Sequence, residues 1–555
     1  MRKMLVIGLD GGTLDVLLPL IDQGRLPALK RLMDRGAWGR LRTVIPPGTG
    51  PAWSSIITGF DPSNHGIADL IVRAPASYDL AFLNALALRA PTVWDVVGRL
   101  GGKVLVLNVP MTYPARAVNG SLISGLDTPA GASGCAYPPE FLDAVRAIEP
   151  GYRITPGEAY VPGRDLSFLA ELASLVGIKT RVLTDLLGKV EWDFAMQVFS
   201  ESDFLQHALW HELDETHPRH RSGSAGDLRA RAIEIYESLD RAIGQAAEAV
   251  GEDGSVLVLS DHGAGPLYEF IHANNILVAT GFMKVRRGVL ARTKHALFRA
   301  GLTPLGVYRL AAALGLGKVR MGLRWTSKGY GLLKRFFFSF SDIDWKRTRA
   351  YAISGGVYGG IFVNLEGREP EGAVPHGEYD RVRQDLKQML LGLRHPLTGK
   401  ALVQQVVMRE ELYRGRFLEE LPDLYFLPSD ATQAVFGDFE FSSNRTVEPA
   451  SEAISAQHRM DGLLVVKGPG IKPGAAPDGV TVVDTMPLVL HLMGLPIPEG
   501  LDGRLPRALF EPGELDRRPP VYSEPEGGPD SAGKPRESTD DESIKQRLKG
   551  LGYIS

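Results

Sequence analysis

Short apolar runs alternate with amphipathic stretches along most of the chain. Five of the runs cover residues 4–10, 103–110, 193–200, 255–263 and 462–470. Runs of this length, rich in Val, Ile and Leu, predict strands that are buried on both faces of a sheet. Apolar positions at helical spacing over 26–36 and 227–251 predict helices between such strands. The pattern therefore predicts an α/β fold whose central, mostly parallel sheet is covered by helices on both faces.

One segment departs from this alternation. Between Gly281 and Ser341 there are thirteen Lys or Arg residues and no Asp or Glu, with apolar residues interleaved. The segment is either a cap or a surface for a membrane or an anionic substrate, or else a helical insertion with a solvated basic face. We therefore predict four parts: a first part of a catalytic core (1–265), a basic helical insertion or cap (266–345), a second part of the core (346–510), and a Pro/Gly/charge-rich tail with a short terminal helix (511–555).

Composition narrows the class of protein. Of 555 residues, 44% are hydrophobic and 23% are charged, as in an ordinary soluble globular protein. The formal net charge of −3 predicts no general affinity for nucleic acid. Cys135 is the only cysteine, which excludes a disulfide framework and a thiolate metal site. The first apolar run is too short for a signal peptide, and no run of 18 apolar residues exists, so we expect a cytoplasmic protein.

Polar side chains follow two of the predicted strands. Asp10 ends the first run, and Asp261 and His262 end the fourth. Ligands of open α/β sheets bind outside the carboxyl ends of strands, so these three groups make a plausible cation site. Taken alone, the Asp-Gly pair at Asp10 is more typical of a turn.

A second set of polar groups lies on a predicted helix. Asp203 and His207 are four residues apart and share a helical face, which suits a divalent metal. Ser200 or Ser202 can cap that helix. The alternative is an exposed helical pair. His211 extends the same face and is a weaker candidate.

His458 lies in a predicted loop before a strand, whereas His65 resembles a turn-stabilising histidine and not a ligand. The candidates are more informative together than separately. Six ligands and one hydroxyl are enough for two divalent metal ions with open positions for substrate, and such a pair clamps an in-line phosphoryl displacement. The set is Asp10, Thr49, Asp203, His207, Asp261, His262 and His458.

The hydroxyl is that of Thr49, in PPGTGPAWSSIITG (46–59). Pro51 fits the first turn of a helix and Gly59 fits its end. Coordination to a divalent cation would make the Thr49 hydroxyl a nucleophile, and free N–H groups at the helix start would hold a phosphoryl oxygen. Gly50 permits close approach of the substrate. The alternative is that Thr49 only caps the helix.

These residues resemble the alkaline phosphatase superfamily, and more narrowly its type I phosphodiesterase/nucleotide pyrophosphatase branch. The segment TGPAWSSIITGFDPSNHGI is similar to the nucleophile segment of that branch. SDHGAG, the Asp-x-x-x-His of residues 203–207, and HRMDGLLVVKGPGIKPG match its metal motifs in order. Other stretches are similar to a bacterial and archaeal group described as predicted phosphohydrolases or phosphomutases. The resemblance covers nearly the whole chain.

The resemblance implies an alkaline-phosphatase-like core with two metal sites. Asp203, His207 and His458 would hold one ion, while Asp10, Asp261 and His262 would hold the other beside Thr49. Zinc is the usual metal of the branch, and manganese is compatible with Asp and His ligands.

One segment departs from the branch. An asparagine that donates to a phosphoryl oxygen usually follows His-Gly-Ile, but here Asp69 and Leu70 stand in its place. An ionised Asp69 would repel a phosphate unless it is protonated or paired. Arg73 or a basic residue of the insertion is then expected to recognise the phosphoryl group. The segment also lacks the Cys/Ser-x-Pro-x-Arg setting of sulfatases, so sulfate esters are not expected.

Three functions follow. The first is a two-metal phosphohydrolase that cleaves phosphodiester or phosphomonoester bonds of a small molecule through a phosphothreonine intermediate. The second is a phosphomutase or phosphotransferase that uses the same intermediate. The third is a non-catalytic binding or membrane-peripheral protein that acts through the basic segment 281–341.

Overall fold

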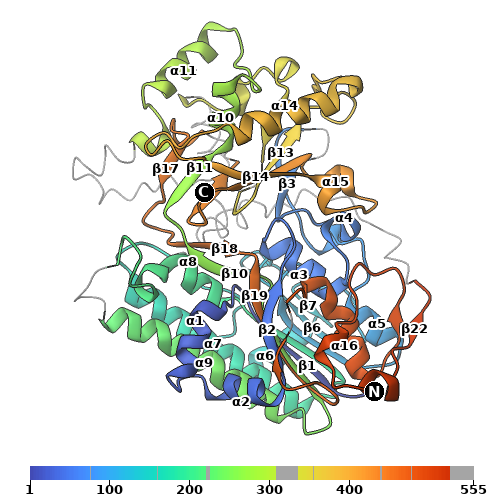
Figure 1. Cartoon of the computed structure of the whole chain (residues 1–555). Coiled ribbons are helices and arrows are strands. Elements are labelled where there is room, and N and C mark those ends of the chain that lie inside the picture. The colour runs from blue at the N-terminus through green and yellow to red at the C-terminus, as the bar shows by residue number, and fades with distance from the viewer. Residues whose placement is uncertain are drawn as a thin grey trace.

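The computed structural model describes residues 1–74, 77–158, 160–220, 226–307, 336–353, 355–437, 441–476 and 478–525. Figure 1 shows a larger body that contains both the first strands and the last described ones, and a smaller body above it. Two predicted features lie outside the described residues: positions 308–335 of the basic segment and the short terminal helix after 525.

The larger body is built on one sheet. Its described strands, from edge to edge, are β20 (Gly474–Ala475), β2 (Ala37–Arg42), β19 (Asp461–Lys467), β9 (Ser255–Leu259), β1 (Met4–Leu9), β8 (Phe194–Phe199), β5 (Val104–Val109), β6 (Gly120–Ser124) and β7 (Ala136–Tyr137). The central strands run parallel, whereas β19 is antiparallel to both β9 and β2. Every residue of β1, β5, β8 and β9 is buried, which explains their uninterrupted apolar runs. The predicted α/β fold with a mostly parallel sheet is confirmed.

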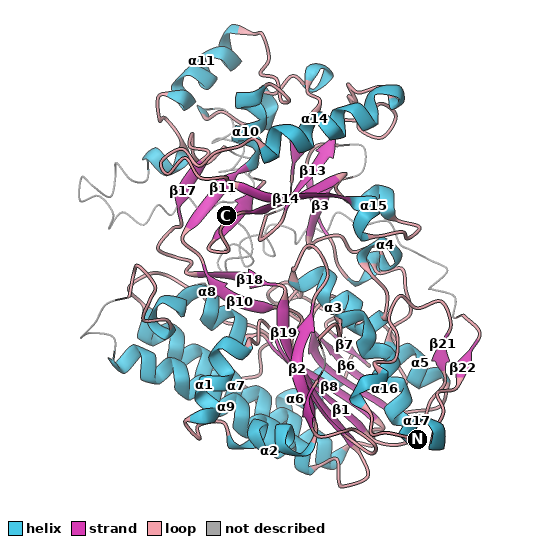
Figure 2. Cartoon of the chain, viewed as in Figure 1, coloured by secondary structure: helices cyan, strands magenta, loops and turns pink. Residues whose placement is uncertain are grey.

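Helices cover both faces of this sheet (Figure 2). One layer contains α2 (Pro27–Arg35), α7 (Asp165–Lys189) and α9 (Gly226–Glu248), and the other contains α3 (Thr49–Thr58), α5 (Val93–Arg99) and α16 (Thr485–Met493). Asp240 of α9 accepts hydrogen bonds from the first N–H groups of α2, at Ala28 and Leu29. Trp53 of α3 packs directly on Gly8 of β1, where any Cβ atom would clash with the indole ring. The position of α3 on the sheet is thereby fixed.

The smaller body has its own apolar core. It holds the antiparallel sheet β12 (Ala350–Ala352), β13 (Gly359–Val363), β15 (Leu424–Pro428) and β14 (Val403–Met408), and the sheet β16 (Gln433–Phe436), β11 (Glu269–His272) and β17 (Val447–Pro449). Helices α10 (Ala273–Thr280) and α14 (Tyr379–Leu391) pack on these sheets, and α11 (Val289–Arg299) lies at the outer end of the body (Figure 1). The core runs from Ile271 to Val447 and thus continues past residue 345, where we expected the insertion to end. We infer that the cap extends to about residue 455, because β12 to β15 pair with one another and not with the main sheet.

A two-stranded ladder joins the bodies. Strand β10 (Gly263–Pro266) leads out of the main body, and β18 (Ala456–Arg459) leads back into it. The two strands are antiparallel, so that Pro266 lies opposite Ala456 and Ala264 lies opposite His458. His458 therefore lies on a strand, and our prediction of a loop at this position is wrong.

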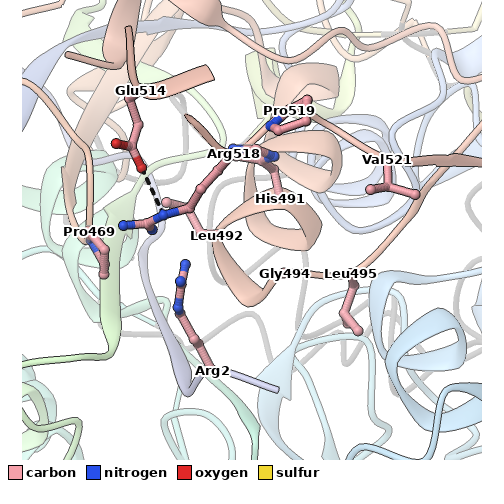
Figure 3. A pocket seen from close by; sticks show the side chains of 10 residues that line it. All are labelled: Arg2, Pro469, His491, Leu492, Gly494, Leu495, Glu514, Arg518, Pro519 and Val521. Atoms are coloured by element: carbon pink, nitrogen blue, oxygen red, sulfur yellow. Dashed lines mark ion pairs between the residues drawn. The ribbon is translucent and has the colours of Figure 1, made fainter. Parts of the chain in front are cut away.

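The described part of the tail packs on the core, where β22 (Tyr522–Ser523) pairs with β21 (Ile497–Pro498). A cavity of about 140 Å³ lies beside it, lined by Arg2, His491 and Arg518 among others (Figure 3). Arg518 is paired with Glu514 at 3.1 Å. Arg2 precedes β1 whereas Asp10 follows it, so this cavity is about 20 Å from the predicted metal ligands, the length of a six-residue strand. None of the described helices is long and apolar enough to cross a bilayer.

Candidate metal centre and active site

Thr49 is the first residue of α3. The residue before it, Gly48, occupies the N-cap position with φ −120°, so Thr49 does not serve as the cap. The Thr49 Oγ1 atom lies 3.4 Å from Nε2 of His262. As predicted, α3 ends at Gly59, which has φ +70°. Within the described residues, the N–H groups of Thr49 and Gly50 have no hydrogen-bond acceptor, as is usual for a first helical turn.

The structure brings the seven predicted residues together and buries all of them. Asp10 follows β1, and Asp261 and His262 follow the neighbouring parallel strand β9, so the three lie at one edge of the sheet. The helix α8 (Glu201–Leu213) supplies two more, and β18 supplies the last. Each of these residues is at most 7% exposed: Asp10, Thr49, Asp203, His207, Asp261, His262 and His458.

One group of ligand atoms comes from α8 and β18. Nε2 of His207 lies 3.4 Å from Oδ1 of Asp203 and 3.0 Å from Nε2 of His458. The Nδ1 atoms of both imidazoles face backbone carbonyl oxygens, of Ala456 at 3.0 Å and of Pro47 at 2.7 Å. These contacts assign the protons to Nδ1 and leave the Nε2 lone pairs facing each other. Such an arrangement is repulsive unless a cation lies between the two rings, so this group fits a metal ion.

A second group of ligand atoms lies beside Thr49. Nε2 of His262 is 3.2 Å from Oδ2 of Asp261 and 3.7 Å from Oδ1 of Asp10. Asp203 belongs to this group as well as to the first, because its carboxylate lies within reach of Asp10 and His262. The sequence had placed Asp203 in one group only. Gly11 permits this proximity: it has φ +67°, and a Cβ atom there would be 2.9 Å from Oδ1 of Asp203.

Asp10 and Asp261 each keep one carboxylate oxygen without a hydrogen-bond donor among the described residues. Oδ1 of Asp10 and Oδ2 of Asp261 are buried and accept no hydrogen bond from any described residue. Burial, and the negative charges of Asp261 and Asp203, raise the pKa of Asp10 well above its usual range. Burial and the charge of Asp203 do the same to the pKa of Asp261. Buried charges are tolerated when they are paired or coordinate a metal, so these residues also fit a divalent cation.

We expect Asp10 to stabilise the metal-free protein more as the pH falls from neutral towards about 5. The raised pKa values of Asp10 and Asp261 mean that these carboxyls bind more protons in the native state than in the unfolded chain, whereas the lowered pKa values of the buried His262 and His458 act in the opposite sense. Urea unfolding of chelator-treated wild type and Asp10→Asn at several pH values measures the carboxyl contribution as the difference between the two proteins, since the histidines are common to both. A metal-loaded sample is the control and should show the opposite trend, because protons compete with the ion. Equal trends in both samples would contradict the expectation.

Two serines at the start of α8 support Asp10. Ser200 occupies the N-cap position, but its side chain makes no capping hydrogen bond. Its hydroxyl instead donates to Oδ2 of Asp10 at 3.4 Å, and the hydroxyl of Ser202 donates to the Asp10 carbonyl oxygen at 2.7 Å. Our prediction of a side-chain cap from Ser200 or Ser202 is therefore wrong, since both serines join α8 to the end of β1.

The other histidines singled out in the sequence lie outside both groups. The Nδ1 atom of His65 accepts from the N–H of Ile67 at 3.1 Å, and its Nε2 lies 3.0 Å from the Ser55 hydroxyl. His65 thus holds the turn after α3, as we expected. His211 belongs to neither ligand group among the described residues.

Three residues were expected to bind substrate. Gly50 packs against Leu70, whose Cδ2 atom would lie 2.9 Å from a Cβ atom at position 50. Asp69 accepts a hydrogen bond from the Leu70 N–H at 2.7 Å, and burial raises the pKa of Asp69 to about 7. Arg73 donates to the carbonyl oxygens of Ala74 and Ser77, and thus to its own loop. Asp69 is therefore partly protonated near neutral pH, which weakens the repulsion of a phosphate.

Tyr413 is a residue that the sequence did not reveal. It belongs to the smaller body, and its hydroxyl accepts from the N–H of Ile45 and donates to the carbonyl oxygen of the same residue, both at 2.7 Å. Ile45 lies four residues before Thr49. Together with the bond from His458 to Pro47, this contact holds the segment before Thr49 at two points. No local sequence pattern marks a tyrosine for this role.

Tyr413→Phe is expected to lower kcat by up to about a hundredfold with little change in KM or metal content, because displaced nucleophiles lose near-attack geometry. Steady-state kinetics on an aryl phosphate ester and elemental analysis measure this effect. Tyr78→Phe is the matched control: its hydroxyl also makes two hydrogen bonds between the bodies, to Asn364 at 2.6 Å and from the Glu371 N–H at 3.2 Å. If kcat falls equally in both variants, the cause is weaker contact between the two bodies in general and not a specific effect on the segment before Thr49.

Comparisons with known proteins relate the chain to one family and to structures of similar fold. The family model "Type I phosphodiesterase / nucleotide pyrophosphatase" matches residues 4–440. No functionally curated protein matches the chain. Phosphonoacetate hydrolase from Sinorhizobium meliloti 1021, solved with phosphonoformate, is similar with a TM-score of 0.51 and 17% identity, over 89% of this chain and 96% of that one. Human ectonucleotide pyrophosphatase/phosphodiesterase 5 has a TM-score of 0.48 and 13% identity, over 91% and 97% of the two chains.

The structural similarity shows the fold, and the family model covers most of the chain. The predicted alkaline-phosphatase-like fold and the predicted enzyme class are confirmed. The family match ends before His458, which the β10–β18 ladder brings into the site. The chain belongs to the type I phosphodiesterase/nucleotide pyrophosphatase family and is an enzyme of the phosphoric ester hydrolase class.

Proposed function

We propose that the protein hydrolyses phosphodiester or phosphomonoester bonds of a small molecule, with Thr49 as the nucleophile. The observation that carries this proposal is the position of Thr49 Oγ1, 3.4 Å from Nε2 of His262 and at the start of a helix. Buried carboxylates and imidazoles lie directly beside this hydroxyl. A hydroxyl in such surroundings can be deprotonated and held in place for attack.

Divalent cations would lower the pKa of the Thr49 hydroxyl and of a water molecule, and would offset the negative charge of the phosphoryl group. Asp203, His207 and His458 would hold one ion, and Asp10 and His262 a second together with Asp261, whose Oδ2 atom is 3.2 Å from His262 Nε2, while the Asp203 carboxylate is close to both sites. Zinc and manganese both suit these nitrogen and oxygen donors.

The reaction would proceed in two displacements. Thr49 Oγ1 forms a bond to phosphorus while the bond to the leaving oxygen breaks, and that oxygen takes up a proton. Water then attacks the phosphothreonine, which releases phosphate or a phosphomonoester and restores the Thr49 hydroxyl. The free N–H groups of Thr49 and Gly50, at the positive end of the α3 dipole, are placed to bind a phosphoryl oxygen in both steps. The half-neutralised Asp69 and the apolar Leu70 would shape the space beside Gly50.

Metal reconstitution tests this proposal. Chelator-treated protein should be inactive, and addition of Zn²⁺ or Mn²⁺ should restore the hydrolysis of aryl phosphate monoesters or diesters. Elemental analysis on the same samples gives the number of ions per chain. Full activity of the metal-free protein would contradict the proposal. So would the absence of hydrolysis of every ester tested when metal ions fill both ligand groups.

A phosphomutase or phosphotransferase would share the first displacement and differ in the second. The acceptor would then be another hydroxyl in place of water. Release of inorganic phosphate from sugar phosphates distinguishes the two, since a mutase returns the phosphoryl group to its product. The cytoplasmic location and the lack of nucleic-acid binding stay predictions.

A further inference from the structure

Exposed apolar side chains gather on one part of the smaller body. Twelve large apolar residues are exposed among the described residues, and five of them lie between positions 289 and 336. Val289 and Leu290 are 83% and 69% exposed. Isolated apolar side chains are normal on a protein surface, but a gathering of them marks an interaction site. The five are Val289, Leu290, Leu297, Leu302 and Phe336.

Three of these side chains lie on α11, and this helix is anchored by its opposite face. The Phe298 ring packs against the rings of Phe338 and Phe441, with centroids 5.2 and 5.7 Å apart. Lys294 forms an ion pair with Asp342 at 3.3 Å, and both side chains are buried. Because these contacts fix the inner face, the outer face of α11 is held towards the solvent.

The outer face combines apolar and basic groups. Leu290, Thr293 and Leu297 share one side of the helix, at spacings of three and four residues. Arg292 and Arg299, seven residues apart and both exposed, lie along the opposite border of the exposed face, with the exposed Val289 and Ala296 between the two rows. An exposed helical face that carries apolar side chains along one border and arginines along the other suits a helix that lies in the interface of an anionic membrane.

We propose that α11 docks the smaller body onto the surface of an anionic lipid bilayer. The sequence from Gly281 to Ser341 contains thirteen Lys or Arg residues and no acidic residue, a charge balance that favours contact with lipid phosphates. Figure 1 shows α11 at the outer end of the smaller body, away from the main sheet, so the helix can lie flat on a plane. The proposal is independent of the phosphohydrolase function.

Vesicle sedimentation with the full-length protein tests this proposal. The protein should sediment with vesicles of phosphatidylcholine and phosphatidylglycerol, but not with phosphatidylcholine alone, and salt should weaken the binding. The variant Arg292→Glu/Arg299→Glu should lose at least roughly twentyfold in affinity, at about fivefold for each cation removed. Leu290→Ser/Leu297→Ser should also lose binding, because it removes the apolar contact.

Two matched variants on the main body are the controls. Leu166 is 54% exposed on α7, and Arg507 is exposed with no ion pair among the described residues, so Leu166→Ser and Arg507→Glu should bind as wild type. Ester hydrolysis in solution should stay unchanged in all variants. Absence of sedimentation with anionic vesicles would overturn the proposal, as would equal losses in the controls. If the α11 variants changed only the oligomeric state on gel filtration, the face would bind a second copy of the chain instead.

Discussion

Thr49→Ala is expected to lower ester hydrolysis by roughly four or more orders of magnitude, as removal of a nucleophile does in other covalent enzymes. The buried ligands Asp10, Asp261 and His262 stay in place in this variant, because Thr49 donates no hydrogen bond that holds them other than its contact with His262. Metal content should therefore stay near that of the wild type. If turnover stops while the metal content stays normal, the role of Thr49 is chemical and not structural.

Two further variants of α3 sharpen this test. Thr49→Ser keeps a hydroxyl at the same position and should retain a measurable fraction of activity. Thr58 lies at the other end of the same helix, where its hydroxyl bonds the Ser54 carbonyl oxygen at 2.7 Å, so Thr58→Ala controls for loss of a buried threonine. Mass spectrometry of quenched wild-type enzyme should show a phosphoryl adduct on the peptide with Thr49. Retention of most activity by Thr49→Ala would exclude this residue as the nucleophile.

Asp203→Asn should have the second largest effect, because its carboxylate reaches both ligand groups. We expect both metal affinities to fall by more than about a hundredfold, since loss of outer-shell partners alone costs that much in other sites. His207→Ala is the comparison: His207 belongs to one group only, so one ion per chain should be retained. Isothermal titration of the metal-free variants measures both affinities. If the two variants lose the same single ion, Asp203 is not shared.

Asp203→Asn should also stabilise the metal-free protein. The charge of Asp203 raises the pKa values of Asp10 and Asp261, which means that it repels both carboxylates. Removal of that charge relieves the repulsion when no cation is present, and urea midpoints measure the gain. The same variant should be less stable than wild type when metal is added. Stability changes of the same sign in both states would contradict this account of the site.

Much of the main body could be predicted from the sequence because its strands are buried on both faces. Strands β1, β5, β8 and β9 are therefore continuous apolar runs, and polar residues at their ends mark the sheet edge where ligands gather. Asp10, Asp261 and His262 were found in this way. The spacing of Asp203 and His207 was enough to predict that both side chains lie on one face of α8, since residues four apart share a helical face.

Other features depend on contacts between distant segments. His458 reaches the site because β18 pairs with β10 in a register that sets it opposite Ala264, about two residues from His262. The inferred limits of the smaller body differ from the predicted bounds of 266–345, because strands of both cores have similar local patterns and pairing indicates to which sheet each belongs. The contact between Tyr413 and Ile45 joins residues 368 positions apart. Local periodicity contains no information on such contacts.

The β10–β18 ladder has a consequence for how enzymes of this architecture can diversify. The chain leaves the main body at Pro266 and returns at Ala456, and these two residues face each other across the ladder. Everything between them can be exchanged for another segment whose ends are equally close, without a change in the ligands that flank the ladder. A new segment would still have to provide the hydroxyl of Tyr413 for the backbone of Ile45. Exchange of the segment between Pro266 and Ala456 would therefore change which molecules the enzyme binds, while the residues that carry out the reaction stay the same.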